Sequence, residues 1–307
     1  MSSDLYPVSV IVHTKNSEST LNRCLDSVSF AQEIIVVDMQ SNDQSKKIAE
    51  KYTDHIFSVK NSGYVETVRN FGIEKATQDW VFILDADEEL SEGLKIWMQS
   101  FLSSSKSDTD VSAYYIPRKN IMFGQEVRHT GWWPDYQLRF FQKGAVKWAE
   151  EIHSQPIASG KVVHLPADPE KCLIHYNYKS VEQFVERMNR YTTIAANESK
   201  QKKTLSSTEL MNAFASEFCQ RLFAWDGTKD GSLGLSLSFL QGMYQFIVKM
   251  KQWETNRFLE KKETEIDTVL AINSFKNILS YWVADWHIKN SRGFAKIGWI
   301  IRRKLSK

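Results

Sequence analysis

The sequence predicts an α/β fold with a mostly parallel central sheet, followed by a helical C-terminal region. Two observations predict it. The first third of the 307 residues alternates short, nearly continuous apolar runs with segments of helical spacing, and the pattern from about Ser180 onward is mostly helical. Such runs are typical of strands covered on both faces, and strands joined by single helices form parallel sheets with right-handed crossovers. The simplest division is an α/β domain at residues 1–180 and a helical region at residues 181–307.

The expected elements follow one another in order. Apolar runs predict strands at residues 8–12, 34–37, 56–57 and 80–84, and strand-like runs recur at residues 113–116 and 137–141. Helical spacing of apolar residues predicts helices at residues 21–28, 65–76 and 90–101. Two capping boxes, Ser41 with Gln44 and Ser180 with Gln183, predict where two further helices begin.

Polar residues follow three of these strands at the point where each strand ends. They are His13-Thr14-Lys15-Asn16, Asp38, and Asp85-Ala86-Asp87. Ligands of open parallel sheets bind beyond the carboxyl ends of the strands. We therefore expect these strand ends to form a ligand site.

Asp85 and Asp87 place two carboxylates one residue apart at the end of a buried strand. Mg²⁺ and Mn²⁺ prefer oxygen ligands, and phosphate and water often supply most of them. A cation held there would neutralise a diphosphate leaving group. The alternative is that these acids cap a helix beginning near Glu88, where the helix dipole favours carboxylates. The position of the pair after three strand–helix units favours the cation site.

Asp38 and Arg69 are further candidates, each with a simpler alternative. Asp38 could accept hydrogen bonds from a uracil-like base or a ribose, or it could cap the loop before Ser41. Arg69 lies on the helix before the Asp85 strand and could offer a guanidinium fork to phosphate, or it could be an ordinary surface arginine.

Five ordered blocks of the sequence resemble those of the family 2 glycosyltransferases, in order and in approximate spacing. They are the segments 7–16, 23–28, 33–38, 69–72 and 84–88. Later segments resemble one branch, which contains bacterial lipopolysaccharide-core glucosyltransferases: Gly131-Trp132-Trp133-Pro134-Asp135 with Arg139, Asn189-Arg190-Tyr191, and Asp230-Gly231 with Gly234. The resemblance covers about residues 6–255.

The resemblance implies a GT-A fold and transfer of a sugar, with inversion, from a nucleotide-sugar donor. Carried over by position, Thr14 and Asn16 would lie against the nucleotide, Asp38 would meet the base and Arg69 would lie near the pyrophosphate. Asp85 and Asp87 would hold Mg²⁺ or Mn²⁺ and the ribose-phosphate. A UDP-linked hexose is the donor that the family favours.

A separate carboxylate would deprotonate the acceptor hydroxyl, and Asp135 is the candidate. It lies in a turn beside Trp132 and Trp133, which could stack on sugar faces or simply contribute to packing. We expect a partly apolar setting to raise the pKa of Asp135, and Arg139 to orient its carboxylate.

The sequence departs from the family pattern at two places. Ser17 stands where a glutamate usually follows the Lys-Asn pair, and Glu18 comes next. Glu150-Glu151-Ile152-His153-Ser154 resembles the late His-Glu pair of the branch, but a serine replaces the glutamate. His153 is a candidate metal or phosphate ligand or a structural histidine, and Glu150 or Glu151 could supply the missing acid.

Net charge, cysteines and the N-terminal residues bear on the partners and the cellular compartment of the protein. A formal net charge of +2 does not indicate a nucleic-acid partner. Cys24, Cys172 and Cys219 have no metal-type spacing and are typical of reduced thiols. The polar N-terminus lacks the basic and apolar stretches of a signal peptide, so we expect a cytoplasmic protein.

The C-terminal region has features of a membrane-surface protein. Residues 232–248 carry no charge but are short and serine-rich for a membrane span, so a core or surface helix is expected. Basic residues and tryptophans dominate the last stretch, with no acid after Asp285. We expect the segment from about Leu233, together with this tail, to lie on the inner face of the cytoplasmic membrane; the tail alternatively is a solvated end.

Two other enzyme classes fit less well, and one non-enzyme remains open. Haloacid dehalogenase phosphatases carry Asp-x-Asp on their first strand, and sugar nucleotidyltransferases begin with a Gly-rich loop; this sequence has neither feature. The predicted function is transfer to a hydroxyl of a glycan or lipid-linked acceptor in cell-envelope polysaccharide or lipopolysaccharide synthesis. The alternative is a catalytically weak membrane-surface binding protein on the same scaffold.

Overall fold

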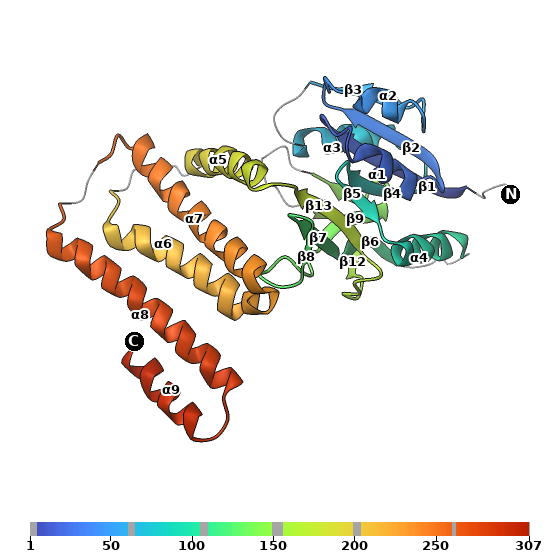
Figure 1. Ribbon diagram of the computed structural model, residues 1–307. Helices are drawn as coiled ribbons and strands as arrows, with labels where there is room; N and C mark the ends of the chain where they lie inside the picture. Colours follow the sequence, from blue (N-terminus) through green and yellow to red (C-terminus); the bar gives the residue numbers. More distant parts are fainter. Residues whose placement is uncertain are drawn as a thin grey trace. The chain divides into compact units, whose positions relative to one another are not determined.

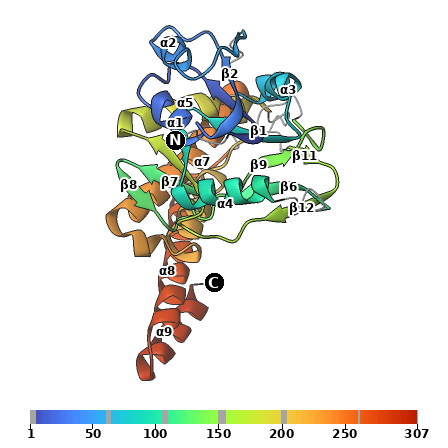
Figure 2. The same cartoon turned by 90° about the vertical axis from the view of Figure 1, so that its right-hand side faces the viewer.

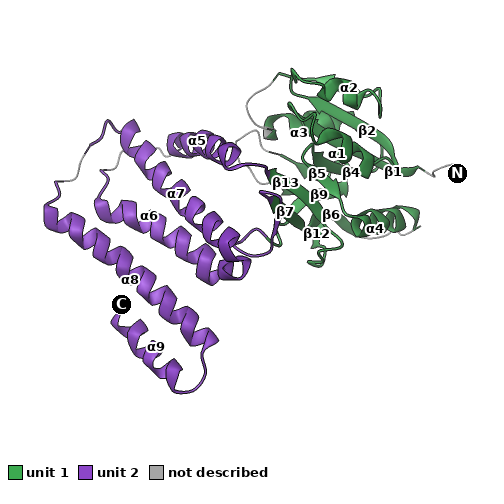
Figure 3. Ribbon diagram, in the orientation of Figure 1, with its two compact units in different colours: residues 1–121, 133–177 green, residues 122–132, 178–307 purple. Residues whose placement is uncertain are grey.

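The computed structural model describes residues 5–60, 65–104, 110–148, 156–198, 204–259 and 262–306, and Figure 1 labels their helices and strands. The chain forms two compact units, which Figure 3 colours separately. Unit 1 comprises residues 1–121 and 133–177, and unit 2 comprises residues 122–132 and 178–307.

Unit 1 is built around a seven-stranded mixed sheet of order β12-β6-β9-β4-β1-β2-β3. Four neighbouring pairs are parallel, and only β9 runs antiparallel to its neighbours β4 and β6. The expectation of a mostly parallel sheet is therefore confirmed. The strands are β1 (Tyr6–Thr14), β2 (Ala31–Asp38), β3 (Ile56–Ser58), β4 (Trp80–Asp85), β6 (Val111–Ile116), β9 (Gln137–Gln142) and β12 (Lys161–His164).

Helices cover both faces of this sheet, which explains why its strands read as continuous apolar runs. The helices are α1 (Leu21–Ser27), α2 (Ser45–Ala49), α3 (Glu66–Lys75) and α4 (Glu92–Ser103). Val8, Val10 and Val12 of β1 face a core shared with α1, α2 and α4, whereas Ile11 faces a second core shared with α3. Because β1 is central and buried on both sides, its carboxyl end has a fixed position in the unit.

Two smaller sheets complete unit 1. One contains the neighbouring strands β5 (Glu88–Leu90), β13 (Leu173–Tyr178) and β7 (Arg118–Met122), and the other pairs β10 (Val146–Lys147) with β11 (Ile157–Ala158). β5 corrects the expectation of a helix from residue 90, because Leu90 lies in this strand. The helix begins at Glu92, where the Ser91 hydroxyl accepts a hydrogen bond from the Leu94 N–H.

The two expected capping boxes have different outcomes. The Ser41–Gln44 box is wrong, because α2 begins at Ser45 without a side-chain cap and the Ser41 N–H donates to Asp38 instead. At the other site the Gln183 N–H donates to Ser180 Oγ at 3.1 Å, so the helix start at Ser180 is confirmed. The Gln183 side chain accepts from the Lys179 N–H rather than from Ser180.

Unit 2 is mainly helical, which confirms the expected helical C-terminal part. Its elements are β8 (Gln125–Val127), α5 (Val181–Glu198), α6 (Ser207–Cys219), a π-helix η1 (Gln220–Ala224), a 3₁₀ helix η2 (Gly227–Asp230), α7 (Gly231–Thr255), α8 (Glu265–Asn290) and α9 (Phe294–Leu305). α7 contacts both α5 and α6, and α9 lies alongside α8 in both views (Figures 1 and 2). Within the described residues, none of the helices has the length and apolar character needed to cross a membrane.

Candidate active site

The carboxyl ends of β1, β2 and β4 lie next to one another in the sheet. Thr14 is in register with Asp38 on β2, and His13 is in register with Asp85 on β4. Thr14 and Asp38 are buried, at 1% and 4% exposure. The structure therefore brings together three of the residues singled out in the sequence, Thr14, Asp38 and Asp85, on adjacent strands.

The loops that leave β1 and β2 are tied together by hydrogen bonds. Asn16 has a positive φ of 48°, its N–H donates to Ser41 Oγ at 2.9 Å, and its side-chain oxygen accepts from the Asn42 N–H at 2.8 Å. Both carboxylate oxygens of Asp38 accept from the Ser41 N–H at 3.2 Å. The loop-capping alternative for Asp38 is thus observed, and its burial keeps the carboxylate in one orientation.

Asp85 is held by two arginines. Arg69 Nη2 donates to its two carboxylate oxygens at 3.0 and 3.2 Å, and Arg139 Nη2 donates at 2.5 Å. Burial alone would raise the pKa of Asp85, but the positive charges of Arg139 and Arg69 outweigh it and hold the pKa well below its usual range. Arg69 is buried rather than a surface arginine, and Asp85 is ionised throughout the neutral range.

Glu88 joins Asp85 to the rest of the cluster. Its side chain is fully buried and accepts hydrogen bonds from Arg139 at 3.0 Å, from Arg118 at 2.8 Å and from the Asp85 N–H at 3.0 Å. Glu88 therefore lies in a strand within the site and does not begin a helix, as the capping alternative required.

Asp135 is oriented by Arg118, and not by Arg139 as expected. Arg118 donates to Asp135 Oδ2 at 2.6 and 2.9 Å, and Asn120 donates to the same oxygen at 3.1 Å. The expected rise of the Asp135 pKa is also wrong. Burial favours a rise, but the charge of Arg118 and the hydrogen bonds from Asn120 and Arg118 lower the pKa overall. Asp135 is a firmly ionised carboxylate.

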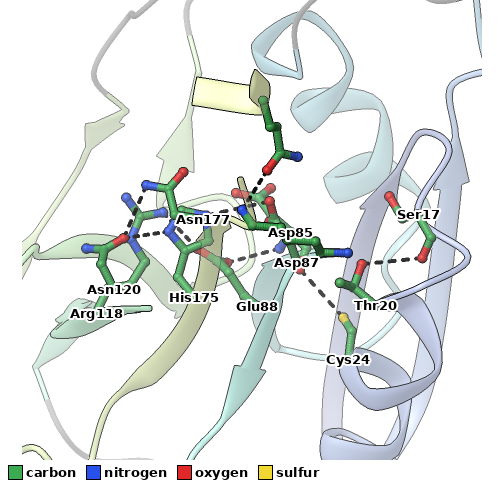
Figure 4. Close-up of polar contacts among 12 residues, drawn as sticks. Ser17, Thr20, Cys24, Asp85, Asp87, Glu88, Arg118, Asn120, His175 and Asn177 are labelled. Carbon is green, nitrogen blue, oxygen red and sulfur yellow. Dashed lines mark hydrogen bonds and ion pairs between the residues drawn. The ribbon is translucent and has the colours of Figure 1, made fainter. Parts of the chain in front are cut away.

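A buried histidine connects Asp87 with Asn120, as Figure 4 shows. His175 Nδ1 lies 2.7 Å from Asn120 Oδ1, and its Nε2 lies 3.6 Å from Asp87 Oδ2. Because Asn120 donates its amide group to Asp135, its Oδ1 is left to accept, so His175 Nδ1 carries a proton. In the neutral ring, Nε2 then presents its lone pair towards Asp87.

A divalent cation that keeps most of its ligands from phosphate and water needs only one or two ligands from the protein. The Asp87 carboxylate and His175 Nε2 are the donors that face each other, while the oxygens of Asp85 are already engaged by arginines. Within the described ranges, no cluster of three or more His, Cys, Asp or Glu side chains is arranged to hold a metal.

Three candidates from the sequence, Trp132, Trp133 and His153, do not take part in the contacts given above. Trp132 belongs to unit 2, where it joins the apolar cluster around Phe184 and Leu237 and lies under the Arg221 guanidinium. Trp133 is half-buried in unit 1. His153 falls in the segment 149–155, which lies outside the described residues.

Sequence reasoning missed four polar residues of the site: Glu88, Arg118, Asn120 and His175. A signal was present, since Arg118 with Asn120, and His175 with Asn177, occur at a spacing of two on the neighbouring strands β7 and β13. Polar side chains at this spacing share one face of a strand. Two such faces on adjacent strands indicate a polar site.

The sequence profile of "Glycosyl transferase family 2" matches residues 9–161. The chain is 22% identical over 199 residues to the "Lipopolysaccharide core biosynthesis glycosyltransferase LpsC" of Rhizobium meliloti, covering 62% of this chain and 71% of that protein. It is 29% identical over 254 residues to an uncharacterized glycosyltransferase of Rickettsia typhi, covering 76% and 85%.

A crystal structure of S. aureus TarS 1-349 aligns with 97% of this chain and 89% of that chain at 17% identity, with a TM-score of 0.37. The matched profile extends from β1 into β12 and so includes the strand ends at Thr14, Asp38 and Asp85. Unit 1 has the GT-A type of fold, and the chain belongs to glycosyl transferase family 2.

Proposed function

We propose that this enzyme transfers a hexose, with inversion, from a UDP-linked donor to a hydroxyl group of a glycan or lipid-linked acceptor. The observation that carries the proposal is the arrangement of Asp38, Asp85 and Asp87 at the carboxyl edge of a family 2 sheet, with Arg69 and Arg139 bound to Asp85. The name of the LpsC relative supports a role in lipopolysaccharide or other cell-envelope polysaccharide synthesis. Residues 1–180 would form the catalytic domain, and residues 181–307 a helical region.

The donor would bind across the strand ends. Asp38, Thr14 and Asn16 would face the nucleoside, with Trp133 as a candidate for stacking on a sugar. Asp87 and His175 would hold Mg²⁺ or Mn²⁺, with Asp85 beside them, and the bound cation would offset charge on the diphosphate leaving group. Arg69 and Arg139 fix the direction of the Asp85 carboxylate. Because this carboxylate is already oriented, it would not need to rearrange when a donor binds.

Asp135 would accept the proton of the acceptor hydroxyl. As that oxygen bonds to the anomeric carbon from the face opposite the diphosphate, the bond between the anomeric carbon and the diphosphate oxygen breaks and the configuration inverts. Arg118 and Asn120 hold Asp135 Oδ2, so the carboxylate is both ionised and oriented at neutral pH. Its lowered pKa makes it a weak base, so the contribution of positioning must be correspondingly large.

Binding and chemistry can be tested separately with two isosteric variants. UDP with Mn²⁺ should raise the thermal midpoint of the native protein, since a ligand at 100 times its Kd adds about 2.7 kcal/mol of stability. Asp85→Asn should lose this stabilisation. Asp135→Asn should keep it but should lower turnover of the donor sugar by roughly 10² or more.

Lys46→Ala, an exposed change on α2, serves as the control and should behave as the native protein. If no nucleotide sugar stabilises the protein or is cleaved with Mn²⁺ or Mg²⁺, the transferase proposal fails. The alternative of a membrane-surface protein without catalysis, which the exposed apolar residues of α9 favour, would then stand.

A further inference from the structure

The outer face of α9 is apolar, although the helix is packed against its neighbour. Four large apolar side chains spaced three or four residues apart are exposed: Phe294 at 93%, Ile297 at 53%, Ile301 at 55% and Leu305 at 82%. This spacing places them on one side of the helix. We call these four residues the α9 stripe.

The opposite face of α9 makes the contacts with α8. The Trp299 ring stacks on His287 with centroids 3.8 Å apart, and Arg303 donates to Asp285 at 2.5 Å. Ser306 donates to Ser280 at 3.0 Å. The helix thus turns a face with polar and charged groups inward and its most apolar face outward, which is the reverse of an ordinary surface helix.

Cations flank the stripe. Arg302 and Lys304 are exposed on either side of Ile301 and Leu305, and Lys296 and Arg292 are exposed near its start. No acidic residue follows Asp285 in the sequence. An apolar stripe with cations on both sides matches the boundary between acyl chains and anionic headgroups, because the apolar side chains can enter the acyl layer while the cations meet phosphate.

The uncharged segment 232–248 lies in α7, and much of it is packed within unit 2. Gly234, Leu237, Ser238, Gly242 and Val248 of α7 are buried within unit 2. α7 contacts both α5 and α6, and Gly242 faces the ring of Phe214 so closely that an added Cβ would lie 2.9 Å from it. Part of the apolar length from about Leu233 therefore contributes to a helix core, and Leu235 and Phe239 of α7 are exposed at 50% and 51%. On α9, exposed apolar side chains and exposed cations occur together.

We propose that the α9 stripe docks this protein onto a bilayer that contains anionic lipid headgroups. The α9 stripe belongs to unit 2 and shares no residue with the strand-end site of unit 1, so the proposal does not depend on sugar transfer. It would hold a transferase near lipid-linked acceptors, and in that respect it extends the proposed function.

The test is flotation of the full chain with vesicles of phosphatidylcholine, with or without phosphatidylglycerol. Binding is expected only with the anionic lipid and should weaken at high salt. Arg302→Glu with Lys304→Glu should weaken it roughly tenfold or more, because each cation near an anionic surface contributes about a fivefold factor. Ile297→Ser with Ile301→Ser should weaken it as well, since both side chains are more than half exposed and carry little of the fold.

Matched controls separate these effects from general changes in charge or apolarity. Lys46→Glu with Lys47→Glu makes the same charge change on α2, and Ile266→Ser with Val269→Ser makes a similar apolar change on exposed positions of α8. Both controls should float as the native chain does. Hydrolysis of the sugar donor by the same preparations is measured without lipid. A variant that loses vesicle binding but keeps hydrolysis therefore tests the membrane proposal and leaves the proposed transferase activity unaffected.

Two outcomes would overturn the proposal. One is equal flotation with and without anionic lipid. The other is a native chain that is oligomeric, becomes monomeric in the Ile297→Ser, Ile301→Ser variant and does not float, which would assign the stripe to contact between copies of the chain.

Discussion

Side chains of alternating charge form a continuous series through the strand-end site. Each contacts the next in the order Arg69, Asp85, Arg139, Glu88, Arg118 and Asp135. Burying a charge is costly unless it is paired and hydrogen-bonded. In this series Glu88 is fully buried and has two arginine partners, so its own desolvation is offset from both sides. The series holds Asp85 and Asp135 in place and links them through Glu88.

Removing Arg118 should destabilise the fold as well as the site. Arg118→Met keeps much of the side-chain volume but takes a cation from both Glu88 and Asp135. We expect the free energy of unfolding to fall by about 3–5 kcal/mol, the range for breaking a buried pair by removing one partner. Urea unfolding followed by circular dichroism measures this change.

Arg128→Met is the matched control. Arg128 pairs with Glu126, but its side chain is 69% exposed, and exposed pairs contribute about 0–1 kcal/mol. Similar losses in the two variants would show that the buried series does not act as described. Partial recovery of stability in Arg118→Lys would support the charge, rather than the shape of the guanidinium, as the cause.

His13 should make stability depend on pH. Burial and then the charge of Arg69 lower its pKa from 6.5 to about 3. Between these values the unfolded chain binds a proton that the native chain does not, so stability falls as pH falls through this window. At pH 5 the loss from this group is about 2 kcal/mol, at about 1.4 kcal/mol per pH unit.

Urea unfolding at pH 7 and pH 5, with EDTA present to exclude metals, measures the effect. His13→Asn should show a smaller fall than the native chain, because its side chain does not titrate. The carboxylates with lowered pKa, Asp85 and Asp135, lose their contribution only below about pH 4, the unfolded value for aspartate, and so do not obscure this comparison. Equal falls in both proteins would contradict the assignment to His13.

At the scale of elements, the sequence allowed the parallel strands and their ends to be predicted. The continuous apolar runs that end in Asp38 and Asp85 were enough to predict a shared site, because parallel strands present their carboxyl ends at one edge of the sheet. Thr14, Asp38 and Asp85 therefore came together without any knowledge of the loops. The helices α1 and α3 were predictable for the same reason, since each follows a strand and has one apolar face.

The partners of Asp85 and Asp135 could not be predicted in the same way. Arg139 is 54 residues from Asp85, and Arg118 is 17 residues from Asp135. Ion pairs between strands depend on the register in which the strands pair, because a shift of one residue turns every side chain of a strand to the other face of the sheet. β5 was missed because Leu90 lies four residues before Leu94 and so continued the helical spacing of α4. The expected apolar setting of Asp135 was wrong because Arg118 and Asn120 come from β7, and no local pattern pairs that strand with the turn.

A glycine at the turn after β8 can be tested in unit 2. Gly131 has a φ of +79°, and an added Cβ would lie 2.4 Å from the Trp225 ring. Gly131→Ala should therefore meet both backbone strain and a clash, and we expect a loss of about 3 kcal/mol, the sum of typical strain and overpacking costs. Gly124→Ala is the control, because Gly124 has a φ of +76° but open space around its Cβ position.

The difference between the two glycine variants isolates the contact with Trp225. Gly124→Ala should cost about 1 kcal/mol, the strain term alone. Thermal unfolding of the two variants measures both terms under the same conditions. If the two losses are equal, the indole does not confine Gly131, and the turn is held by other contacts such as the Arg221 hydrogen bond to the Thr130 carbonyl.

At the scale of the whole molecule, charge and apolar surface are distributed unevenly. The net charge of +2 is the sum of two different distributions: a buried series of paired charges in unit 1, and a surplus of cations over acids on the last helix of unit 2. The first distribution suits a diphosphate and a cation, and the second suits an anionic surface. The net charge alone could not distinguish these two sites, because the charges of the whole chain nearly cancel in the sum.

A chain ending at Asn290 should keep donor hydrolysis and lose vesicle binding. The contacts described for α9 are with α8, through Trp299, Arg303 and Ser306. Asp285 would still pair with Lys289 at 3.0 Å, so this partly exposed acid of the shortened α8 keeps a partner. A chain ending at Leu259 is the contrast, because it also removes Phe275 and Trp282 from the cluster around Phe214, Phe218 and Leu222. A fully buried aromatic contributes about 1.5–3 kcal/mol. Phe275 and Trp282 are partly buried, so each contributes a fraction of that, and the shorter chain should unfold at a lower temperature. Loss of hydrolysis on removing α9 alone, with an unchanged thermal midpoint, would instead assign that helix a part in the reaction.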